Sequence, residues 1–294
     1  MLQTAWVRER IAARYPGIPL EVAQIRTTGD KITNVPLAKI GGKGLFVKEI
    51  EEALLRKEID LAVHSMKDVP TELPPGLHLG AITEREDPRD VLISKDAREL
   101  LELPSGGKIG TSSLRRKAQL LGINPRWEIV PMRGNLDTRI RKLEIEGLDA
   151  VILAAAGIRR MGLEAKITEY LPLEVMLPAV GQGALGIECR QDAEVNEVIS
   201  FLNHIDTALA VRGERSFLRR LKGGCQVPIA AYGEMREGRL LMWGMVAHLD
   251  GSRFFRTEAQ GGDPEEVGER LAEDLLSQGA EEILREIYQD AGEG

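Results

Sequence analysis

The stretch "KIGTSSLRRKAQLLG", residues Lys108–Gly122, decides the fold class of this chain. Its first three residues read as a short buried strand, and from Leu114 onward the apolar residues recur with the period of a helix. Hydroxyl side chains at Thr111 to Ser113 separate the two elements and are typical of a helix N-terminus. A strand that leads directly into a helix is the repeating unit of an α/β fold.

The same rhythm continues on both sides of this stretch. Apolar runs predict strands and periodic segments predict helices: strands at 20–26, 60–65, 91–94, 128–132 and 149–156, and helices at 2–17, 46–54 and 136–147. Continuous apolar runs between helices are typical of parallel strands buried on both faces. Two segments of similar rhythm therefore predict two doubly wound α/β domains.

The last third of the chain has a different pattern. A helix at 207–222 leads to apolar runs at 227–235, 239–249 and 253–261, with the turns "REG" and "LDG" between them and a closing helix from Pro264. This pattern predicts an α+β domain with a three-stranded antiparallel sheet. The expected domains are 1–83 with 183–202 (domain 1), 84–182 (domain 2) and 203–294 (domain 3), because the glycine-rich crossing at 177–190 returns to the first domain.

Composition narrows the class of protein. The chain has 294 residues, of which 43% are hydrophobic and 29% charged, and a formal net charge of -7. Two cysteines and four scattered histidines give no zinc-type spacing, so we expect no metal. An acidic chain without a dense Lys/Arg face is not expected to bind nucleic acid. The absence of a long apolar run or signal-peptide pattern predicts a cytoplasmic protein with a small-molecule partner.

Arginines follow three successive strands of the predicted second domain. They are Arg115 and Arg116 after the first strand, Arg133 with Arg139 after the second, and Arg159 with Arg160 after the third. Ligands of doubly wound sheets bind beyond the carboxyl ends of the strands. Arginine binds carboxylates and phosphates through a bidentate fork. This arrangement in an acidic protein predicts a site for a ligand with several anionic groups.

Three further segments admit two interpretations each. In "LKGGCQVP", Leu221–Pro228, two glycines and a proline flank Cys225, which suits either a presented thiol or a helix C-cap before a buried cysteine. Lys67 and Asp68 follow the strand at 60–65 as a functional pair or as an ordinary solvated one. The segment 27–49 is either a mobile loop or a cationic lid.

Six motifs in this order resemble the porphobilinogen deaminase family of tetrapyrrole biosynthesis, across nearly the whole chain. They are "AVHSMKDVP", "GTSSLRR", "RGNLDTR", "AAAGIRRMGL", "PAVGQGALGIECR" and "GGCQVPIAAYG". The resemblance implies a cytoplasmic, monomeric, three-domain transferase. Such an enzyme condenses four porphobilinogen molecules head to tail with release of ammonia, and then hydrolyses off the linear tetrapyrrole hydroxymethylbilane.

The resemblance also implies roles for individual residues. A dipyrromethane cofactor would be bound through a thioether to Cys225, Asp68 would be catalytic, Lys39 and Lys43 would belong to a lid, and Cys189 would be buried and structural. Cofactor-binding residues would be Ser65, Lys67, Asp68, Thr111, Ser113, Arg115, Arg116, Arg133, Arg139 and Gly183. Substrate-binding residues would be Gln3, Arg133, Arg139, Arg160 and Arg190.

The chemistry of the substrate agrees with the residue types. Porphobilinogen carries an acetate and a propionate, so a chain of pyrroles is a polyanion that suits the strand-end arginines. Loss of ammonia leaves an electron-poor methylene pyrrolenine, and a carboxylate near the pyrrole N–H groups stabilises the positive charge that develops. Asp68 in "SMKDVP" would supply this carboxylate.

The start of the chain departs from the family pattern. The family begins with a strand carrying an Arg-x-Ser-x-Leu-Ala pattern, whereas this sequence starts at Met1 inside the helix that should follow, without an N-cap. We therefore expect about fifteen residues upstream, with an Arg-x-Ser core in the missing first strand, because a central strand is needed to pair its neighbours. Without that strand, a truncated and inactive form is an alternative.

Two alternatives come from other functional classes. The two α/β halves also resemble periplasmic binding proteins, so a non-catalytic anion-binding module is possible, and such a module would not need Cys225. A thiol-redox protein is the weaker alternative, because no resolving cysteine lies near Cys225 in the sequence.

Overall fold

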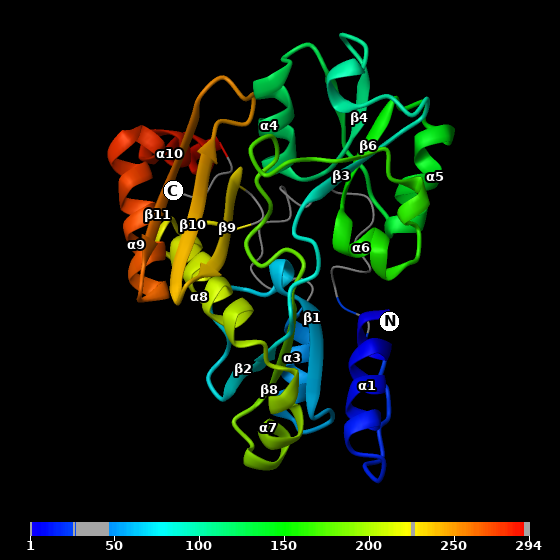
Figure 1. The fold of residues 1–294 in the computed structure, drawn as a ribbon, viewed down its shortest axis with the longest axis vertical. Coiled ribbons are helices and arrows are strands. Elements are labelled where there is room, and N and C mark those ends of the chain that lie inside the picture. Colours follow the sequence, from blue (N-terminus) through cyan, green and yellow to red (C-terminus); the bar gives the residue numbers. More distant parts are fainter. Residues whose placement is uncertain (1, 26, 28–46, 225–226, 291–294) are drawn as a thin grey trace. The chain divides into compact units, whose positions relative to one another are not determined.

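The computed structural model describes residues 2–25, 27, 47–224 and 227–290. These residues belong to two compact units (Figure 1). Unit 1 comprises residues 1–86 and 184–209, and unit 2 comprises residues 87–183 and 210–294. The chain therefore passes from unit 1 to unit 2 after residue 86 and returns to unit 1 at Ala184. It passes to unit 2 a second time within the helix Ile205–Arg220.

Unit 1 contains a three-stranded sheet in the order β1-β8-β2. Its strands are β1 (Leu61–Ser65), β2 (Leu77–Ile82) and β8 (Leu185–Arg190), and both pairs are antiparallel. Its helices are α1 (Leu2–Arg14), α3 (Lys48–Leu55) and α7 (Ala193–Ile199), with the 3₁₀ turns η2 (Met66–Asp68) and η5 (Ser200–Leu202). Val7 and Ile11 of α1 pack with Ile187 of β8 in the core of this unit.

Unit 2 contains a mixed five-stranded sheet in the order β5-β4-β6-β3-β7. Its strands are β3 (Asp90–Ser94), β4 (Lys108–Gly110), β5 (Glu128–Val130), β6 (Ala150–Ala154) and β7 (Glu169–Tyr170). The connecting helices are η3 (Leu100–Glu102), α4 (Leu114–Ile123), α5 (Leu136–Ile145), α6 (Ala155–Arg160) and η4 (Glu164–Lys166). Strand β4 is parallel to β5 and β6, whereas β3 is antiparallel to β6 and β7.

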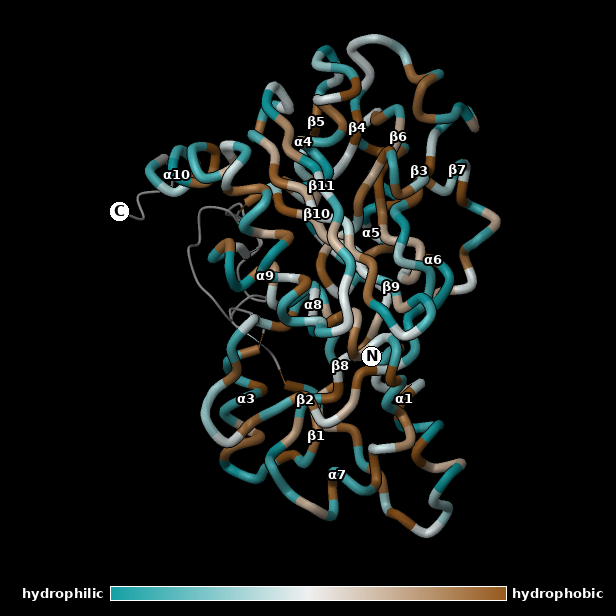
Figure 2. Tube along the Cα trace, turned by 60° about the vertical axis from the view of Figure 1, so that its left-hand side comes forward, coloured by the Kyte–Doolittle hydropathy of each residue, from teal (hydrophilic) through white to brown (hydrophobic). Residues whose placement is uncertain are grey.

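Helices cover both faces of this sheet because successive side chains of its central strands point to opposite sides. Leu92 and Ile152 pack with Leu120 of α4 on one face. Val91 and Val151, their neighbours in sequence, belong to the cluster on the other face, together with residues of α5 and α6. Figure 2 shows the hydrophobic residues gathered in the strands of this sheet. The continuous apolar runs of the sequence are thus explained by burial on both sides.

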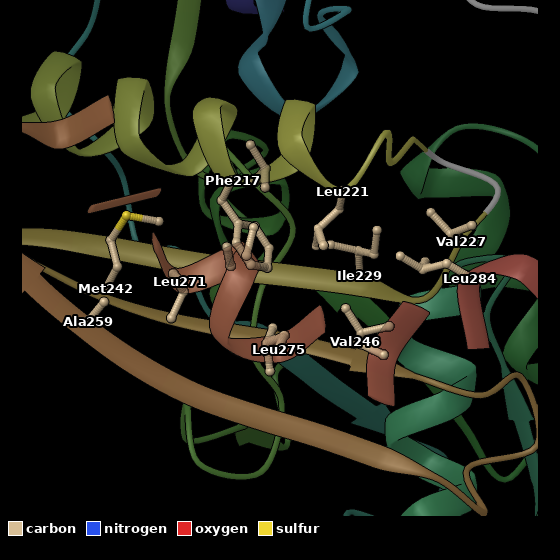
Figure 3. Close-up of a cluster of buried hydrophobic side chains, with 14 of the residues drawn as sticks. Phe217, Leu221, Val227, Ile229, Met242, Val246, Ala259, Leu271, Leu275 and Leu284 are labelled. Carbon is tan, nitrogen blue, oxygen red and sulfur yellow. The ribbon is translucent and has the colours of Figure 1, made fainter. Parts of the chain in front are cut away.

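The rest of unit 2 is a three-stranded antiparallel sheet in the order β11-β10-β9, with helices on one face. Its elements are α8 (Ile205–Arg220), β9 (Ile229–Arg236), β10 (Arg239–Ala247), β11 (Phe254–Gly261), α9 (Pro264–Leu275), the kinked segment η6 (Leu276–Ala280) and α10 (Glu281–Asp290). Figure 3 shows Phe217 of α8 and Leu271 of α9 packed against Met242 of β10. Ala118 of α4 packs with Met245 on the other face.

Side-chain caps fix where several helices begin. Ser113, Asn135, Asp192 and Asp263 each accept a hydrogen bond from a backbone N–H in the first turn of the helix that follows, namely α4, α5, α7 and α9. Each such cap contributes about 0.5 to 2 kcal/mol. At α9 the cap is followed by Pro264 at the first helical position, where no backbone donor is needed.

The predicted fold class is confirmed, and the pairing within it is corrected. The α/β organisation and the C-terminal three-stranded antiparallel sheet are present as predicted. The expectation of parallel strands throughout both α/β domains is wrong: among the described strands, β4 is parallel to β5 and β6, whereas the pairs of unit 1 are antiparallel. Apolar runs report burial on both faces and carry no information on the direction of the neighbouring strand.

Some elements were misassigned or missed. Residues 20–25 of the predicted strand at 20–26 lie outside every sheet among the described residues, and residue 26 is outside that set. Residues 20–25 have no partner strand among the described residues, and a strand requires a partner. Strand β2 and helices α6 and α7 were not predicted, and the predicted strand at 149–156 ends at Ala154, where α6 begins.

The three-domain division at 84–182 and 203–294 stays a prediction. No described helix is both long and apolar enough to cross a membrane.

We expect the cluster at the C-terminal sheet to dominate the stability of this part of unit 2. Phe217 is fully buried, and Phe217→Ala should lower the free energy of unfolding by about 3 to 5 kcal/mol, because it leaves a cavity among α8, α9 and β10. Urea unfolding followed by circular dichroism measures the change. Phe254→Ala is the matched control, since Phe254 lies on β11 of the same sheet and is 41% exposed. Equal effects of the two substitutions would contradict this account of the core.

Candidate active site

In unit 1 the segment after β1 holds Asp68 on a tight turn. Ser65 ends the strand and Met66, Lys67 and Asp68 form the 3₁₀ turn η2. Met66 and Val69 are buried, the Val69 N–H donates to the Met66 carbonyl, and the Met66 N–H donates to the Ala184 carbonyl. Asp68 lies between these two anchors and is exposed. The apolar anchors therefore fix the backbone while the carboxylate remains accessible.

A buried contact between a histidine and a carboxylate lies at the end of β1 from which this turn begins. His64 of β1 and Glu188 of β8 are both buried, and Nε2 of His64 is 2.9 Å from Oε2 of Glu188. Burial raises the pKa of Glu51 on α3, as does the neighbouring charge of Glu188, while His64 acts in the opposite direction. Because His64 precedes Ser65, this pair fixes the end of β1 from which the turn begins.

In unit 2 the segments after three parallel strands leave the sheet at one edge. Strands β5, β4 and β6 run in the same direction, so Thr111, Pro131 and Ala155 follow their ends on the same side. Ser112 ties two of these segments together, because its hydroxyl donates to the Met132 carbonyl and accepts from the Met132 N–H. The segments that follow these three strands therefore begin at one edge of the sheet.

Arg115 and Arg116 lie in the first turn of α4 and share one carboxylate. Asp90 Oδ2 is 2.7 Å from Arg115 Nη1, and Asp90 Oδ1 is 2.7 Å from Arg116 Nη2. All three side chains are buried, with Asp90 fully so. Burial by itself would raise the pKa of Asp90, but the two guanidinium groups hold it well below its usual range. Burial lowers the pKa of Arg115, against the opposing effect of Asp90.

The contacts of Asp90 change the interpretation of Arg115 and Arg116, whose charges predicted an anionic ligand. Two cations at a helix N-terminus require a nearby anion, and the chain itself provides one in Asp90, at the start of β3. Sequence reasoning missed Asp90 because an acid directly before an apolar strand looks like an exposed boundary residue. The roles of Arg115 and Arg116 in cofactor binding stay predictions.

The segment 181–183 is held by three charged or polar partners. The Gly181 N–H donates to Glu214 at 2.6 Å, Gln182 Nε2 donates to Asp90 Oδ1 at 2.9 Å, and the Gly183 carbonyl accepts from Arg160 Nη2 at 2.7 Å. Gly181 and Gly183 have φ of 71° and 96°, a conformation that favours glycine. Arg160, predicted as a substrate ligand, thus contacts Gly183, a predicted cofactor-binding residue.

Other predicted residues of unit 2 lie on the same strand-end segments. Thr111 is buried and its hydroxyl accepts from the Ser113 N–H at 3.3 Å, while Ser113 is the N-cap of α4. Arg133 is half-buried before Gly134, whose φ is 107°, and Arg139 Nε donates to the Gly134 carbonyl at 2.9 Å.

In unit 1, Arg190 performs a structural task that sequence reasoning missed. Its Nη1 donates to the Leu54 and Ile59 carbonyls at 2.8 and 2.6 Å, and its Nη2 contacts Asp60 at 2.8 Å. The guanidinium thereby satisfies carbonyls at the C-terminal end of α3 and before β1. Gln3 is half-buried in the first turn of α1. The substrate-binding roles predicted for both residues stay predictions.

The remaining predicted residues concern two segments that are only partly described. Lys39, Lys43 and Cys225 lie outside the described residues. Gly223, before Cys225, is packed so closely that a Cβ would lie 2.6 Å from both Leu218 and Ile229, whereas a Cβ on Gly224 would meet open space. The left-handed residue after α8 is Lys222, with φ of 51°. Packing explains the first glycine of the pair, and the second has free space around it.

Cys189 has the buried environment expected for it. It lies on β8, fully buried, 3.4 Å from His78 Nε2. Burial raises the pKa of the Cys189 thiol to about 11, so the reactive thiolate is scarce at neutral pH. No group of His, Cys, Asp and Glu side chains within the described part of the chain could hold a metal ion.

Comparison with known proteins gives one consistent result. Family models described as "Porphobilinogen deaminase, dipyromethane cofactor binding domain" and "Porphobilinogen deaminase, C-terminal domain" match residues 1–197 and 208–277. Porphobilinogen deaminase of Pelobacter propionicus is 58% identical over 290 residues, covering 98% of this chain and 93% of the relative. That of Carboxydothermus hydrogenoformans is 53% identical over 294 residues, covering 99% of this chain and 94% of the relative.

Solved structures of binding proteins match only weakly. The substrate-binding protein of an amino acid ABC transporter is 15% identical, with a TM-score of 0.35 over 68% of this chain and 80% of that one. A likeness at this level carries no argument. The family models and the curated relatives are what disfavour the alternative of a non-catalytic binding module.

The ion pairs of Asp90 with Arg115 and Arg116 make the free energy of unfolding depend on pH in the acidic range. A carboxyl whose pKa is lowered on folding stabilises the protein above its unfolded pKa, about 3.9, and this contribution is lost as the pH falls through the folded value. We expect Asp90→Asn to lower the free energy of unfolding by about 3 to 5 kcal/mol at pH 7, since both arginines lose their charge partner. The difference from the unsubstituted chain should shrink between pH 4 and 2 in thermal unfolding experiments. A difference independent of pH would contradict the assigned pairing.

Proposed function

The chain belongs to the porphobilinogen deaminase family, and from this we propose that it is a porphobilinogen deaminase, a transferase of tetrapyrrole and heme biosynthesis. It joins four porphobilinogen molecules head to tail on a dipyrromethane primer and then releases hydroxymethylbilane by hydrolysis. For each unit the aminomethyl C–N bond breaks, ammonia leaves, a C–C bond forms to a pyrrole α-carbon, and that carbon loses its proton. The observation that carries this proposal is 58% identity over 290 residues to a relative of this name.

The residues of unit 2 suit a cofactor that bears carboxylates. Two guanidinium groups face one carboxylate in the Asp90 pair, and Arg116 Nε is buried without a hydrogen-bond acceptor among the described residues. A positive excess with an unused donor fits an anionic group. When bound, dipyrromethane supplies the pyrrole α-carbon to which the first substrate unit is joined.

We assign the binding of this group to the residues of both units that the sequence motifs select. They are Ser65, Lys67, Asp68, Thr111, Ser113, Arg115, Arg116, Arg133, Arg139 and Gly183, with Cys225 as the thioether ligand. The location of several of them on one edge of the sheet supports this assignment. Substrate carboxylates are assigned to Gln3, Arg133, Arg139, Arg160 and Arg190, and lid functions to Lys39 and Lys43.

Asp68 carries the catalytic role in this proposal. Its carboxylate accepts hydrogen bonds from pyrrole N–H groups and offsets the positive charge that develops as ammonia leaves. The exposed position of Asp68 between two buried anchors supports this role, because a preorganised carboxylate needs no rearrangement as the charge forms. Lys67 beside it provides a cation for a substrate carboxylate.

We further infer that the enzyme acts in the cytoplasm as a monomer and does not bind nucleic acid. The net charge of -7 supports the last point, since phosphate binding requires a positive surface.

Asp68→Asn should separate catalysis from folding. We expect the variant to keep its melting temperature and its two-pyrrole adduct while turnover falls by at least a hundredfold, because a neutral amide stabilises a cationic pyrrole poorly. Turnover is measured as porphobilinogen consumption at saturating substrate. Glu72→Gln, a nearby acid outside the motif, is the control. Near-normal turnover of Asp68→Asn would remove Asp68 from the mechanism.

Cys225 should carry the cofactor. Denaturing mass spectrometry of the protein purified from cells that make porphobilinogen should show an adduct of two pyrrole units, and Cys225→Ala should remove it. Cys189→Ala is the control, because the Cys189 thiol is buried and its pKa is raised. An adduct that persists in Cys225→Ala would refute the attachment, and an unmodified mass for the unsubstituted chain would refute the proposed function.

A further inference from the structure

We propose that Asp90 is a positioning residue of the cofactor site. It holds the guanidinium groups of Arg115 and Arg116 in place and balances one of their two charges, so that the pair accepts one carboxylate of the ligand. This inference rests on the proposed function, because it takes the two arginines as ligands of dipyrromethane. Asp90 itself acts through the arginines.

The side-chain contacts of Asp90 come from two separate segments, helix α4 and the crossing segment that contains Gln182. Its Oδ2 accepts from Arg115 Nη1 and its Oδ1 from Arg116 Nη2, both at 2.7 Å. Gln182 Nε2, from the segment that crosses back toward unit 1, donates to the same Oδ1 at 2.9 Å. The register of β3 with β6 pairs Asp90 with Ala154, so Asp90 lies at the edge where β6 ends.

Each arginine is also anchored away from Asp90, which fixes its direction. Arg115 Nη1 donates to the Leu177 carbonyl at 2.7 Å, and Arg116 Nη1 donates to the Ile152 carbonyl at 3.0 Å. Gln119 holds residue 177 by accepting from its N–H at 2.7 Å and donating to its carbonyl at 3.1 Å. Arg116 is thus held at both of its terminal nitrogens, whereas Arg115 is held at Nη1, which donates to two acceptors. These contacts restrict the orientation of both guanidinium groups.

The charge of this group is not balanced within itself. One fully buried carboxylate faces two guanidinium groups that are each 5% exposed, which leaves one positive charge. Both arginines also stand in the first turn of α4, where the helix dipole disfavours cations. A buried net charge is costly unless it is paired. Arg116 Nε, buried and without an acceptor in the described part of the chain, is a donor on which a ligand carboxylate can complete the pairing.

Two substitutions separate the negative charge of Asp90 from the position of its carboxylate, and this makes the proposal testable. Asp90→Asn removes the charge, which leaves two uncompensated cations that attract a simple anion more strongly. Asp90→Glu keeps the charge but moves the carboxylate by one methylene in a fully buried position, which turns the arginines. If Asp90 served only the stability of the fold, any variant that folds would load the cofactor at the normal rate.

The experiment uses the full chain, prepared without cofactor in cells that lack porphobilinogen. Loading is the rate at which the two-pyrrole adduct appears by mass spectrometry after porphobilinogen is added. The anion probe is inorganic sulfate, whose effect on the melting temperature is measured separately. Asp87→Asn is the matched control: it removes a carboxylate three residues upstream, which pairs with Arg89.

We expect both Asp90 variants to load at least tenfold more slowly, and Asp87→Asn to load at the normal rate. Sulfate should raise the melting temperature of Asp90→Asn more than that of the unsubstituted chain or of Asp90→Glu. A folded Asp90→Glu that loads normally, or a sulfate effect equal in all proteins, would overturn the proposal.

Two outcomes need a second measurement. If neither Asp90 variant folds, Gln182→Leu decides, because it removes one donor to Asp90 and no charge: loading slowed about threefold supports the proposal, and normal loading overturns it. If the unsubstituted chain never acquires the adduct, the proposed function has failed. The sulfate comparison still tests whether Asp90 balances the arginines, since it requires no cofactor.

Discussion

Two guanidinium groups on neighbouring residues of one helix repel each other, and their burial adds the cost of desolvation. In unit 2 the Asp90 carboxylate offsets both effects, because it accepts one hydrogen bond from Arg115 and one from Arg116. These contacts join the start of β3 to the start of α4, and Gln182 adds the crossing segment. The edge of the sheet at which the candidate site lies therefore depends on one side chain that stands just before the predicted strand at 91–94.

Helices cover both faces of the sheet around this edge. Alternating side chains of β3 and β6 feed two separate apolar clusters, one under α4 and the other under α5 and α6. Polar groups of the connecting segments therefore gather beyond the strand ends, as in other doubly wound sheets. Ser113 and Asn135 begin α4 and α5 there by capping them, which fixes the direction of the side chains that follow.

In unit 1, too, buried residues fix the position of a polar group that follows a strand. Met66 and Val69 are buried on either side of Asp68, so the η2 turn has little freedom although its carboxylate is exposed. The pair of His64 and Glu188 supports the strand from which this turn begins. For the catalytic role that we propose for Asp68, an exposed carboxylate on a rigid turn combines access for the substrate with a fixed position.

The sequence by itself determined the α/β class, most helices, the C-terminal antiparallel sheet and the family, because periodicity, capping residues and motifs are local properties. It also selected the strand-end arginines. Only the tertiary structure decided the direction of strand pairing in unit 1 and the partners of the charged side chains. Asp90 and Arg190 show why: Asp90 lies 25 residues from Arg115, and Arg190 lies 136 residues from Leu54. The partner of each charged side chain is set by contacts between segments far apart in the chain, and local patterns do not encode such contacts.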